Sequence, residues 1–174
     1  MKTLRNAFAL IIFGALAGCA GRGEPLETVS YVDLERFMGD WYVIAHIPTF
    51  IEDEAHNAIE SYELNGDRID TTFTFRNKRF DGPEKRYEPN AIVRDSRSNA
   101  VWGMQFVWPF RSDFRIVHLD EDYATTIIGR NARDYVWIMA REPEISDVKY
   151  DELVQAVSDM GYDLSELRRV PQSW

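Results

Sequence analysis

Apolar and polar residues alternate along much of this sequence with a period of two, the pattern of β-strands that have one buried face. In the run 68–76, Ile69, Phe73 and Phe75 share one parity, whereas the other parity carries only polar residues. An Asn-Gly pair at 65–66 precedes this run and favours a tight hairpin turn. The segments predicted as strands are Asp40–Pro48, Ala58–Leu64, Arg68–Phe75, Arg86–Arg94, Val101–Trp108, Phe114–Asp120, Thr125–Gly129 and Tyr135–Ala140.

The period changes near the C-terminus, where a helix is predicted. Ser146 is an N-cap residue and Gly161 is a stop signal. The apolar stripe between them consists of Tyr150, Leu153, Val154 and Val157. Antiparallel strands joined by short loops can close into an up-and-down barrel, and about eight of them leave an interior wide enough for one small ligand. We therefore predict an all-β protein, an eight-stranded antiparallel up-and-down β-barrel with one C-terminal α-helix packed outside.

The apolar parities of the strands identify the side chains expected inside the barrel. The candidate ligand-binding residues are Phe73, Phe75, Trp102, Met104, Phe106, Phe114, Ile116 and His118. A wall of aromatic and methionine side chains suits a flexible acyl chain. The alternative is a packed core without a cavity, because eight strands can also enclose a filled interior. His118 would bind a polar group of the ligand or a metal, or it would be a hydrogen-bonded core histidine.

The N-terminus has the pattern of a secretory signal peptide. Lys2 and Arg5 precede an apolar run over 7–17, which is too short for a normal transmembrane helix. The string LAGC at 16–19 resembles the lipobox of bacterial lipoproteins, in which the peptide is cut before the cysteine and the new terminal cysteine is lipidated. The alternative is ordinary secretion with an incidental cysteine.

Cys19 is the only cysteine, so an intramolecular disulfide cannot form and a lipid anchor is its best use. Several acyl chains are enough for stable attachment to a membrane. By the lipoprotein sorting pattern, Ala20 resembles outer-membrane cargo. We therefore predict a signal peptide over 1–18, a lipidated tether over 19–30 and a folded domain over 31–174. The protein is expected to be anchored to the periplasmic face of the outer membrane.

Charge and missing motifs argue against several classes of function. The formal net charge of −9 makes nucleic acid and anionic membrane surfaces poor partners. The three histidines show no metalloprotease spacing, and the chain has neither a GxSxG nucleophile elbow nor a phosphate-binding glycine loop. We therefore expect a protein that is not an enzyme, with no catalytic residue, no metal and no cofactor. We expect it to be a monomer or homodimer.

Three blocks of the sequence resemble those of the lipocalins. They are FMGDWY at 37–42, LDEDYATTIIG at 119–129 and RDYVWIMAREPEIS at 133–146. The matching positions are Gly39 and Trp41 in the first block, Asp120 and Tyr123 in the second, and Arg141 in the third. With the lipobox, this ordered set resembles the bacterial lipocalins, outer-membrane lipoproteins of the calycin type.

The resemblance implies structural roles for these residues. Trp41 would plug the closed end of the barrel, Arg141 would stack across it, and Gly39 would let the chain turn beneath the floor. The acidic cluster at 120–122 would form a floor turn rather than a cation site. The loops 49–55, 77–83, 109–113 and 130–134 would then surround the open mouth.

The mouth has two features of interest. Trp108 and Phe110 would form an apolar lip. The basic residues there would either meet an anionic head group or belong to an ordinary rim of mixed charge. These bases are Lys78, Arg79, Arg111, Arg130 and Arg133.

Two main functions are compatible with these observations. The first is a membrane-anchored lipocalin that carries, stores or scavenges fatty acids, lysophospholipids or phospholipids in the cell envelope. The second is an enzyme on the same scaffold, of an isomerase or epoxide-handling type. Paired carboxylates inside the barrel would favour the enzyme, but the apolar parities of the strands contain none. A weaker possibility is an envelope scaffold that binds protein.

Overall fold

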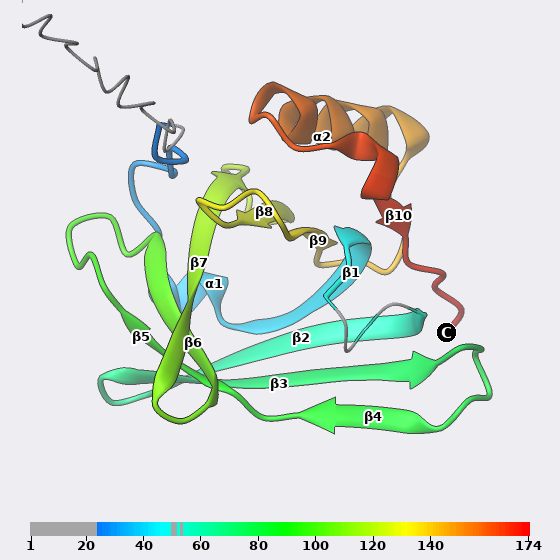
Figure 1. The fold of residues 1–174 in the computed structure, drawn as a ribbon, viewed down its shortest axis with the longest axis horizontal. Helices are drawn as coiled ribbons and strands as arrows, with labels where there is room; N and C mark the ends of the chain where they lie inside the picture. Colours follow the sequence, from blue (N-terminus) through cyan, green and yellow to red (C-terminus); the bar gives the residue numbers. More distant parts are fainter. Residues whose placement is uncertain (1–23, 50–51, 53) are drawn as a thin grey trace, which may run out of the picture.

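One antiparallel sheet closed into a barrel dominates the computed structural model, which describes residues 24–49, 52 and 54–174 (Figure 1). Its strands are β1 (Gly39–Ile47), β2 (Ala55–Asn65), β3 (Arg68–Asn77), β4 (Glu84–Tyr87), β5 (Asn90–Val93), β6 (Val101–Val107), β7 (Phe110–Leu119), β8 (Thr125–Gly129) and β9 (Val136–Ala140). Neighbours in the sequence pair in turn, and β9 pairs with β1 to close the sheet. Because β4 and β5 both pair with β3, they act as one interrupted strand, and the predicted eight-stranded barrel is confirmed for the described residues.

The interruption divides a segment that the alternation predicts as one strand, Arg86–Arg94. Strand β4 ends at Tyr87, and β5 begins only at Asn90. Pro89 lies between them, and a proline has no N–H group to donate to a neighbouring strand. Its carbonyl oxygen instead accepts a hydrogen bond from the Thr71 amide at 3.0 Å. The pairing with β3 is therefore interrupted at Pro89 and resumes in β5.

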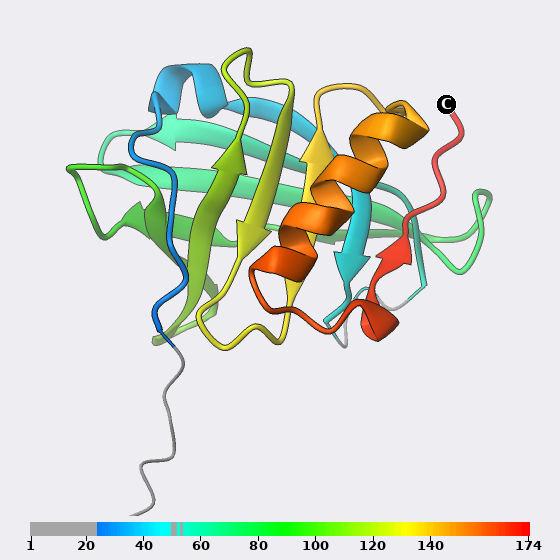
Figure 2. The same cartoon turned by 90° about the horizontal axis from the view of Figure 1, so that it is seen from above.

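The predicted C-terminal helix is present as α2 (Asp147–Asp159), with Ser146 as its N-cap. The Ser146 hydroxyl accepts a hydrogen bond from the Lys149 amide. Leu153 and Val157 are buried against side chains on the outer face of β8 and β9. Figure 2 shows the helix lying across the outside of the barrel, as the sequence predicts.

Short elements that the alternation does not reveal lie at both ends of the chain. The helix α1 (Leu34–Phe37) begins at the N-cap Asp33 and leads into β1. After α2, the short helix η1 (Leu164–Glu166) leads to β10 (Arg168–Arg169), which pairs with Ala45 and His46 of β1. Elements this short have no measurable periodicity, which is why the alternation does not reveal them. Their positions depend on contacts with the barrel.

The two ends of the barrel differ. Helix α1 and the turns after β2, β5 and β7 lie at one end, which we call the floor, and the loops after β1, β3, β6 and β8 lie at the other, which we call the mouth. The described chain begins at the mouth, where the Leu26 amide donates to Asn131 Oδ1 at 2.8 Å and Arg133 donates to the Glu24 carbonyl at 3.3 Å. Figure 2 shows this N-terminal end at the end of the barrel opposite α1. From Leu26, which is buried, the chain runs along the barrel to the floor.

Candidate ligand-binding site

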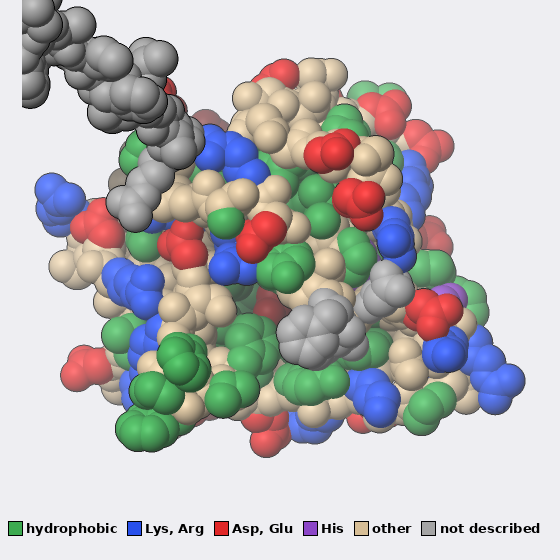
Figure 3. Space-filling view, viewed as in Figure 1, with side chains coloured by type: hydrophobic (Ala, Val, Ile, Leu, Met, Phe, Trp, Pro, Cys, Tyr) green, Lys and Arg blue, Asp and Glu red, His purple; other side chains and the backbone are tan. Residues whose placement is uncertain are grey.

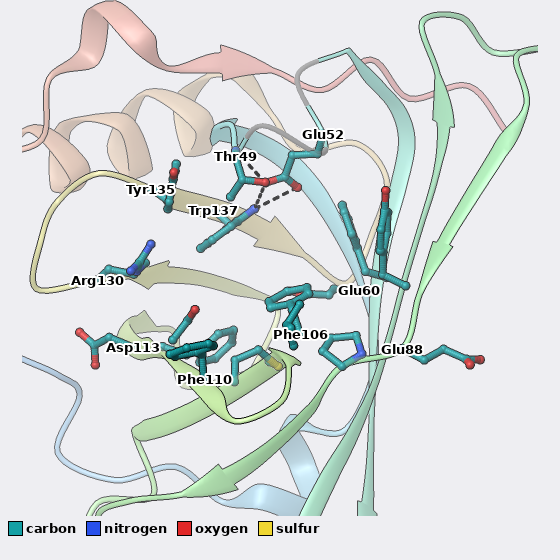
Figure 4. Close-up of a pocket in the computed structure, with 17 residues that line it drawn as sticks. Thr49, Glu52, Glu60, Glu88, Phe106, Phe110, Asp113, Arg130, Tyr135 and Trp137 are labelled. Carbon is teal, nitrogen blue, oxygen red and sulfur yellow. Dashed lines mark hydrogen bonds between the residues drawn. The ribbon is translucent and has the colours of Figure 1, made fainter.

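A cavity of about 590 Å³ occupies the mouth half of the barrel. Aromatic and aliphatic side chains form most of its wall: Phe73, Tyr87, Pro89, Met104, Phe106, Val107, Phe110, Phe114, Tyr135 and Trp137. The polar residues that complete the lining are Thr49, Glu52, Glu60, Glu88, Ser112, Asp113 and Arg130. Figure 4 draws all 17 lining residues as sticks and labels ten of them. The size and the wall suit a small molecule with a large apolar part.

An aromatic cluster fills the barrel below the cavity. Trp102 and Phe114 are stacked, with 5.0 Å between ring centroids. Phe37 and Tyr62 meet Trp102 edge-on at 5.5 and 5.6 Å. We call these four residues the aromatic plug. The interior is therefore hollow towards the mouth and packed towards the floor, which combines the two alternatives that the sequence leaves open.

Four of the predicted ligand-binding residues line the cavity: Phe73, Met104, Phe106 and Phe114. Trp102 lies in the plug beneath it, and Phe75 and Ile116 are buried inside the barrel without reaching the cavity wall. Phe106 is 48% exposed, which places it at the mouth. Strand parity thus separates inside from outside but does not give the depth of a side chain along the barrel.

His118 lies on the outer side of the barrel, and the parity argument that placed it inside is wrong. The pairing of β7 with β8 shifts between Ile116 and His118, so the strand contains a β-bulge. His118 is paired with Ile127, whose side chain belongs to the cluster under α2. Burial there lowers the pKa of His118, and the nearby Lys149 lowers it further, against the opposing effect of Asp120.

Glu60 is a polar residue of the lining that parity could have identified. On β2 it alternates with Ala58 and Tyr62, which both belong to the interior cluster, so it points inward as well. The Tyr62 hydroxyl donates a hydrogen bond to Glu60 Oε2. Burial raises the pKa of Glu60 to about 7; the Tyr62 hydrogen bond lowers it, and the charge of Glu52 adds to the increase.

Glu52 is the second inward carboxylate, and it comes from the loop after β1. Its Oε1 accepts hydrogen bonds from Trp137 Nε1 at 3.2 Å and from the Thr49 amide at 3.1 Å. His46 Nδ1 lies 3.8 Å from Glu52 Oε2, and both side chains are almost completely buried. Figure 4 shows the Glu52 carboxylate held between Thr49 and Trp137 at the edge of the cavity.

The lining therefore contains two inward carboxylates, and the expectation that the interior has none is wrong. The other two acids of the lining are turned towards partners outside the cavity. Glu88 pairs with Arg86 at 2.8 Å and Asp113 with Arg115 at 2.9 Å. Figure 4 shows both side chains directed away from the centre of the cavity.

The basic residues at the mouth have partners within the protein. Lys78 pairs with Glu54 at 3.6 Å, Arg79 with Asp81 at 3.0 Å and Arg130 with Asp134 at 3.2 Å. Arg111 donates to the Gly103 carbonyl at 3.0 Å and Arg133 to the Met160 carbonyl at 2.7 Å. Arg130 alone among them lines the cavity. This arrangement favours an ordinary rim of mixed charge over a preformed anion site.

The predicted signature residues meet at the floor. Trp41 is fully buried, and Arg141 lies across its ring. Gly39 has φ +91°, a left-handed conformation in which other residues are strained. Asp120 accepts hydrogen bonds from the amides of residues 124 and 125, and the Tyr123 hydroxyl accepts one from the Asp33 amide. These contacts are those of a structural floor turn.

The described residues contain neither a cluster of metal ligands nor a helix that could span a membrane. No group of three or more His, Cys, Asp or Glu side chains there is arranged to hold a metal ion. Within the same residues, no helix is both long and apolar enough to cross a bilayer.

Comparison with known proteins gives the family. Residues 32–172 match the lipocalin-like domain. Temperature-induced lipocalin-1 of Arabidopsis thaliana is 30% identical over 161 residues, which cover 86% of this chain and 84% of that protein. Outer membrane lipoprotein Blc of Escherichia coli K12 is 28% identical over 162 residues and 90% of each chain. The structure of insecticyanin from Manduca sexta superposes with a TM-score of 0.67 at 16% identity, over 85% of each chain.

The geometry and the comparisons agree on the kind of site. A closed antiparallel barrel with a largely apolar cavity at one end is a binding site for small hydrophobic ligands. The match to the lipocalin-like domain covers most of the chain. The chain therefore belongs to the lipocalins of the calycin superfamily, as a bacterial lipocalin.

Proposed function

We propose that this protein is a membrane-anchored carrier or scavenger that binds an amphiphilic lipid by reversible burial, without chemical conversion. The observation that carries the proposal is the cavity of about 590 Å³ above the aromatic plug. Its wall of Phe73, Met104 and Phe114 would cover the hydrocarbon part of a fatty acid, a lysophospholipid or one chain of a phospholipid. The polar part would remain near the mouth or meet the few polar groups of the lining.

The proposal includes a lipid anchor on Cys19 after removal of residues 1–18. Both lie outside the described residues, so the support comes from the lipobox string and from the position of Glu24 in the fold. Glu24 is at the mouth, and five residues of chain span at most about 17 Å. An acyl group on Cys19 would therefore keep the mouth close to the membrane surface. The relatives named outer membrane lipoprotein support the outer membrane as that surface.

An apolar lip at the same end supports this orientation. Val107, Trp108 and Phe110 are 67%, 82% and 76% exposed at the tip of the β6–β7 hairpin. Figure 3 shows hydrophobic side chains gathered over this hairpin. Apolar residues clustered beside an opening are typical of a surface that meets lipid or a partner. A lipid could then pass between the membrane and the cavity with little exposure to water.

An acid–base enzyme is the second candidate, because Glu52 and Glu60 both face inward. We favour binding because each carboxylate is already engaged. Glu52 accepts from Trp137 and Thr49, and Glu60 accepts from Tyr62. A scaffold that binds protein would have no use for the cavity.

Native mass spectrometry of the mature protein, purified in mild detergent from its membrane, tests the proposal. We expect a population whose mass exceeds that of the acylated chain by one noncovalently bound amphiphile, released intact on collisional activation. A ligand-free protein that also fails to bind added fatty acid or lysophospholipid would contradict it. Conversion of an added lipid into a product of different mass would instead favour the enzyme.

A further inference from the structure

The closed end of the cavity is acidic, which has consequences for the head group of a ligand. Glu60 is paired with Phe73 across β2 and β3, and its neighbour Tyr62 belongs to the aromatic plug. Glu60 therefore lies where the hollow part of the barrel ends. One carboxylate oxygen accepts from Tyr62, so the group has acceptor capacity left for a ligand.

The described lining has no free cation that would balance this acid. Arg130 is at the mouth, paired with Asp134 at 3.2 Å and stacked on Tyr135. His46 lies behind Glu52, with Nδ1 at 3.8 Å from its carboxylate and no hydrogen-bond partner in the described residues. Glu52 and Glu60 are close enough for the charge of one to raise the pKa of the other. A carboxylate or phosphate head group placed beside them would be a further negative charge in a poorly solvated space.

An alkylammonium group fits the same place. It carries three N–H donors, which the Glu60 carboxylate could accept, and it would compensate the negative charge. The Phe73 and Tyr87 rings line the cavity beside Glu60, and aromatic faces attract cations. The apolar wall above them would surround the hydrocarbon chain, which would point towards the mouth.

From this geometry we propose that the cavity binds long-chain primary amines with the amino group innermost, and that Glu60 is the residue that selects the cationic head group. The proposal rests on the proposed function, since it assumes that an amphiphile occupies the cavity. It adds a ligand class, amphiphiles with a cationic amine, and an orientation, head group towards the plug. Fatty acids would bind more weakly and with the chain innermost.

Three ligands with the same hydrocarbon chain test the proposal: hexadecylamine, hexadecanol and palmitic acid. Each is titrated below its critical micelle concentration, at neutral pH, against the protein loaded with the neutral fluorescent probe N-phenylnaphthylamine. We expect the amine to displace the probe at a concentration at least about tenfold lower than palmitic acid, with the alcohol between them. Palmitic acid displacing the probe as well as the amine would overturn the proposal. If the probe binds and none of the three displaces it, the proposed function fails as well.

Glu60→Gln identifies the selecting residue, because it removes the charge with almost no change in shape. We expect this variant to lose the preference for the amine, so that hexadecylamine binds about as well as hexadecanol. Glu63→Gln is the matched control, since Glu63 is exposed on the same strand, and its ranking of ligands should equal that of the wild type. An amine preference that persists in Glu60→Gln, with an unchanged melting temperature, would overturn the assignment of Glu60. The wild-type ranking remains informative whatever the stability of the variant.

Discussion

Arg141 lies over Trp41, with its guanidinium carbon 3.8 Å from the ring centroid. The same guanidinium donates to the carbonyl oxygens of Arg36, Phe37 and Met38 at 2.8–3.0 Å, and to that of Asp40 at 2.7 Å. The first three carbonyls belong to the end of α1, where a helix leaves its last oxygen atoms without partners. One side chain therefore covers the buried indole and completes the helix that closes the floor. Burial lowers the pKa of Arg141, against the opposing effect of Asp40. Arg141 nevertheless stays charged, because neutral pH lies far below the pH at which an arginine side chain loses its proton.

Replacing Trp41 by alanine should destabilise the protein strongly. The change removes a fully buried ring and leaves the Arg141 stack without its partner, which we expect to cost about 3–5 kcal/mol of unfolding free energy. This is a large part of the roughly 5–15 kcal/mol that is typical of a whole domain. Urea denaturation measures the difference. Trp108→Ala is the matched control, because Trp108 is 82% exposed and should tolerate the same change. Equal stability of the two variants would contradict a buried floor tryptophan.

Filling the cavity should weaken ligand binding without unfolding the barrel. Ser112 is a small, exposed residue of the lining, so Ser112→Trp adds a ring over the cavity and removes no buried group. We expect the affinity for N-phenylnaphthylamine to fall by about tenfold or more, since the added ring occupies space that the ligand needs. Ser96→Trp makes the same change in an exposed floor loop and should bind like the wild type. Unaltered binding by a folded Ser112→Trp protein would place the ligand elsewhere.

The stability of the barrel should depend on pH through Glu60. Burial raises the pKa of Glu60 to about 7, whereas the unfolded value is near 4.5, so the folded state binds more protons between these pH values. Ionising this carboxyl therefore destabilises the fold, and the loss grows as pH rises from about 4.5 to 7. Relative to Glu60→Gln, the wild type should lose up to about 3 kcal/mol over this range. Urea titrations of both proteins at several pH values measure it. A difference between them that is independent of pH would show that Glu60 does not titrate in this way.

Cys19→Ala should prevent membrane anchoring. Cys19 is the only cysteine, so the variant has no acceptor for lipidation at the lipobox. We expect the wild type expressed in a bacterial host to incorporate labelled palmitate and to sediment with membranes, and the variant to do neither. A second variant, Ser30→Ala, controls for changes in expression. Equal incorporation of label into wild type and Cys19→Ala would disprove lipidation at this residue.

The apolar lip should contribute to contact with lipid even without the anchor. A protein beginning at Glu24 retains Trp108 and Phe110 and should sediment with neutral phosphatidylcholine vesicles. The double change Trp108→Ser and Phe110→Ser should remove most of the vesicle binding, because these rings supply the exposed apolar area. Tyr31→Ser changes an exposed ring elsewhere and should have no such effect. Vesicle binding that is equal in all three proteins would argue against the lip.

The sequence predicted the barrel because each strand has one dry face and one wet face, and it failed where local geometry breaks the alternation. Pro89 divides one predicted strand, and the bulge after Ile116 reverses the side on which His118 lies. Neither change alters the period of the hydrophobic residues enough to be seen in advance. Helix α1 is only four residues long, and it forms because Phe37 is buried in the plug and Asp33 caps its first turn.

The candidate site was predictable in part for the same reason. Parity found the apolar wall, and the positions of Ala58 and Tyr62 on either side of Glu60 would have placed that carboxylate inside. Glu52 could not have been found in this way, because it lies in a loop and is directed inward by its hydrogen bonds to Thr49 and Trp137. The depth of a side chain along the barrel could not be predicted either, because alternation does not separate Trp102 in the plug from Met104 in the cavity wall.

The aromatic plug determines how different ligands are exposed. Protein interiors are close-packed, so the stacked rings of Trp102 and Phe114 form a rigid base that a longer chain cannot push aside. Ligands of one homologous series that are longer than the cavity would thus all bury the same length of chain, and each additional methylene would emerge at the mouth. Short chains would be enclosed completely, whereas long chains would keep a segment in contact with their surroundings. Beyond the length that fills the cavity, affinity would therefore change little with chain length, whereas the protruding segment that a membrane could take up would grow.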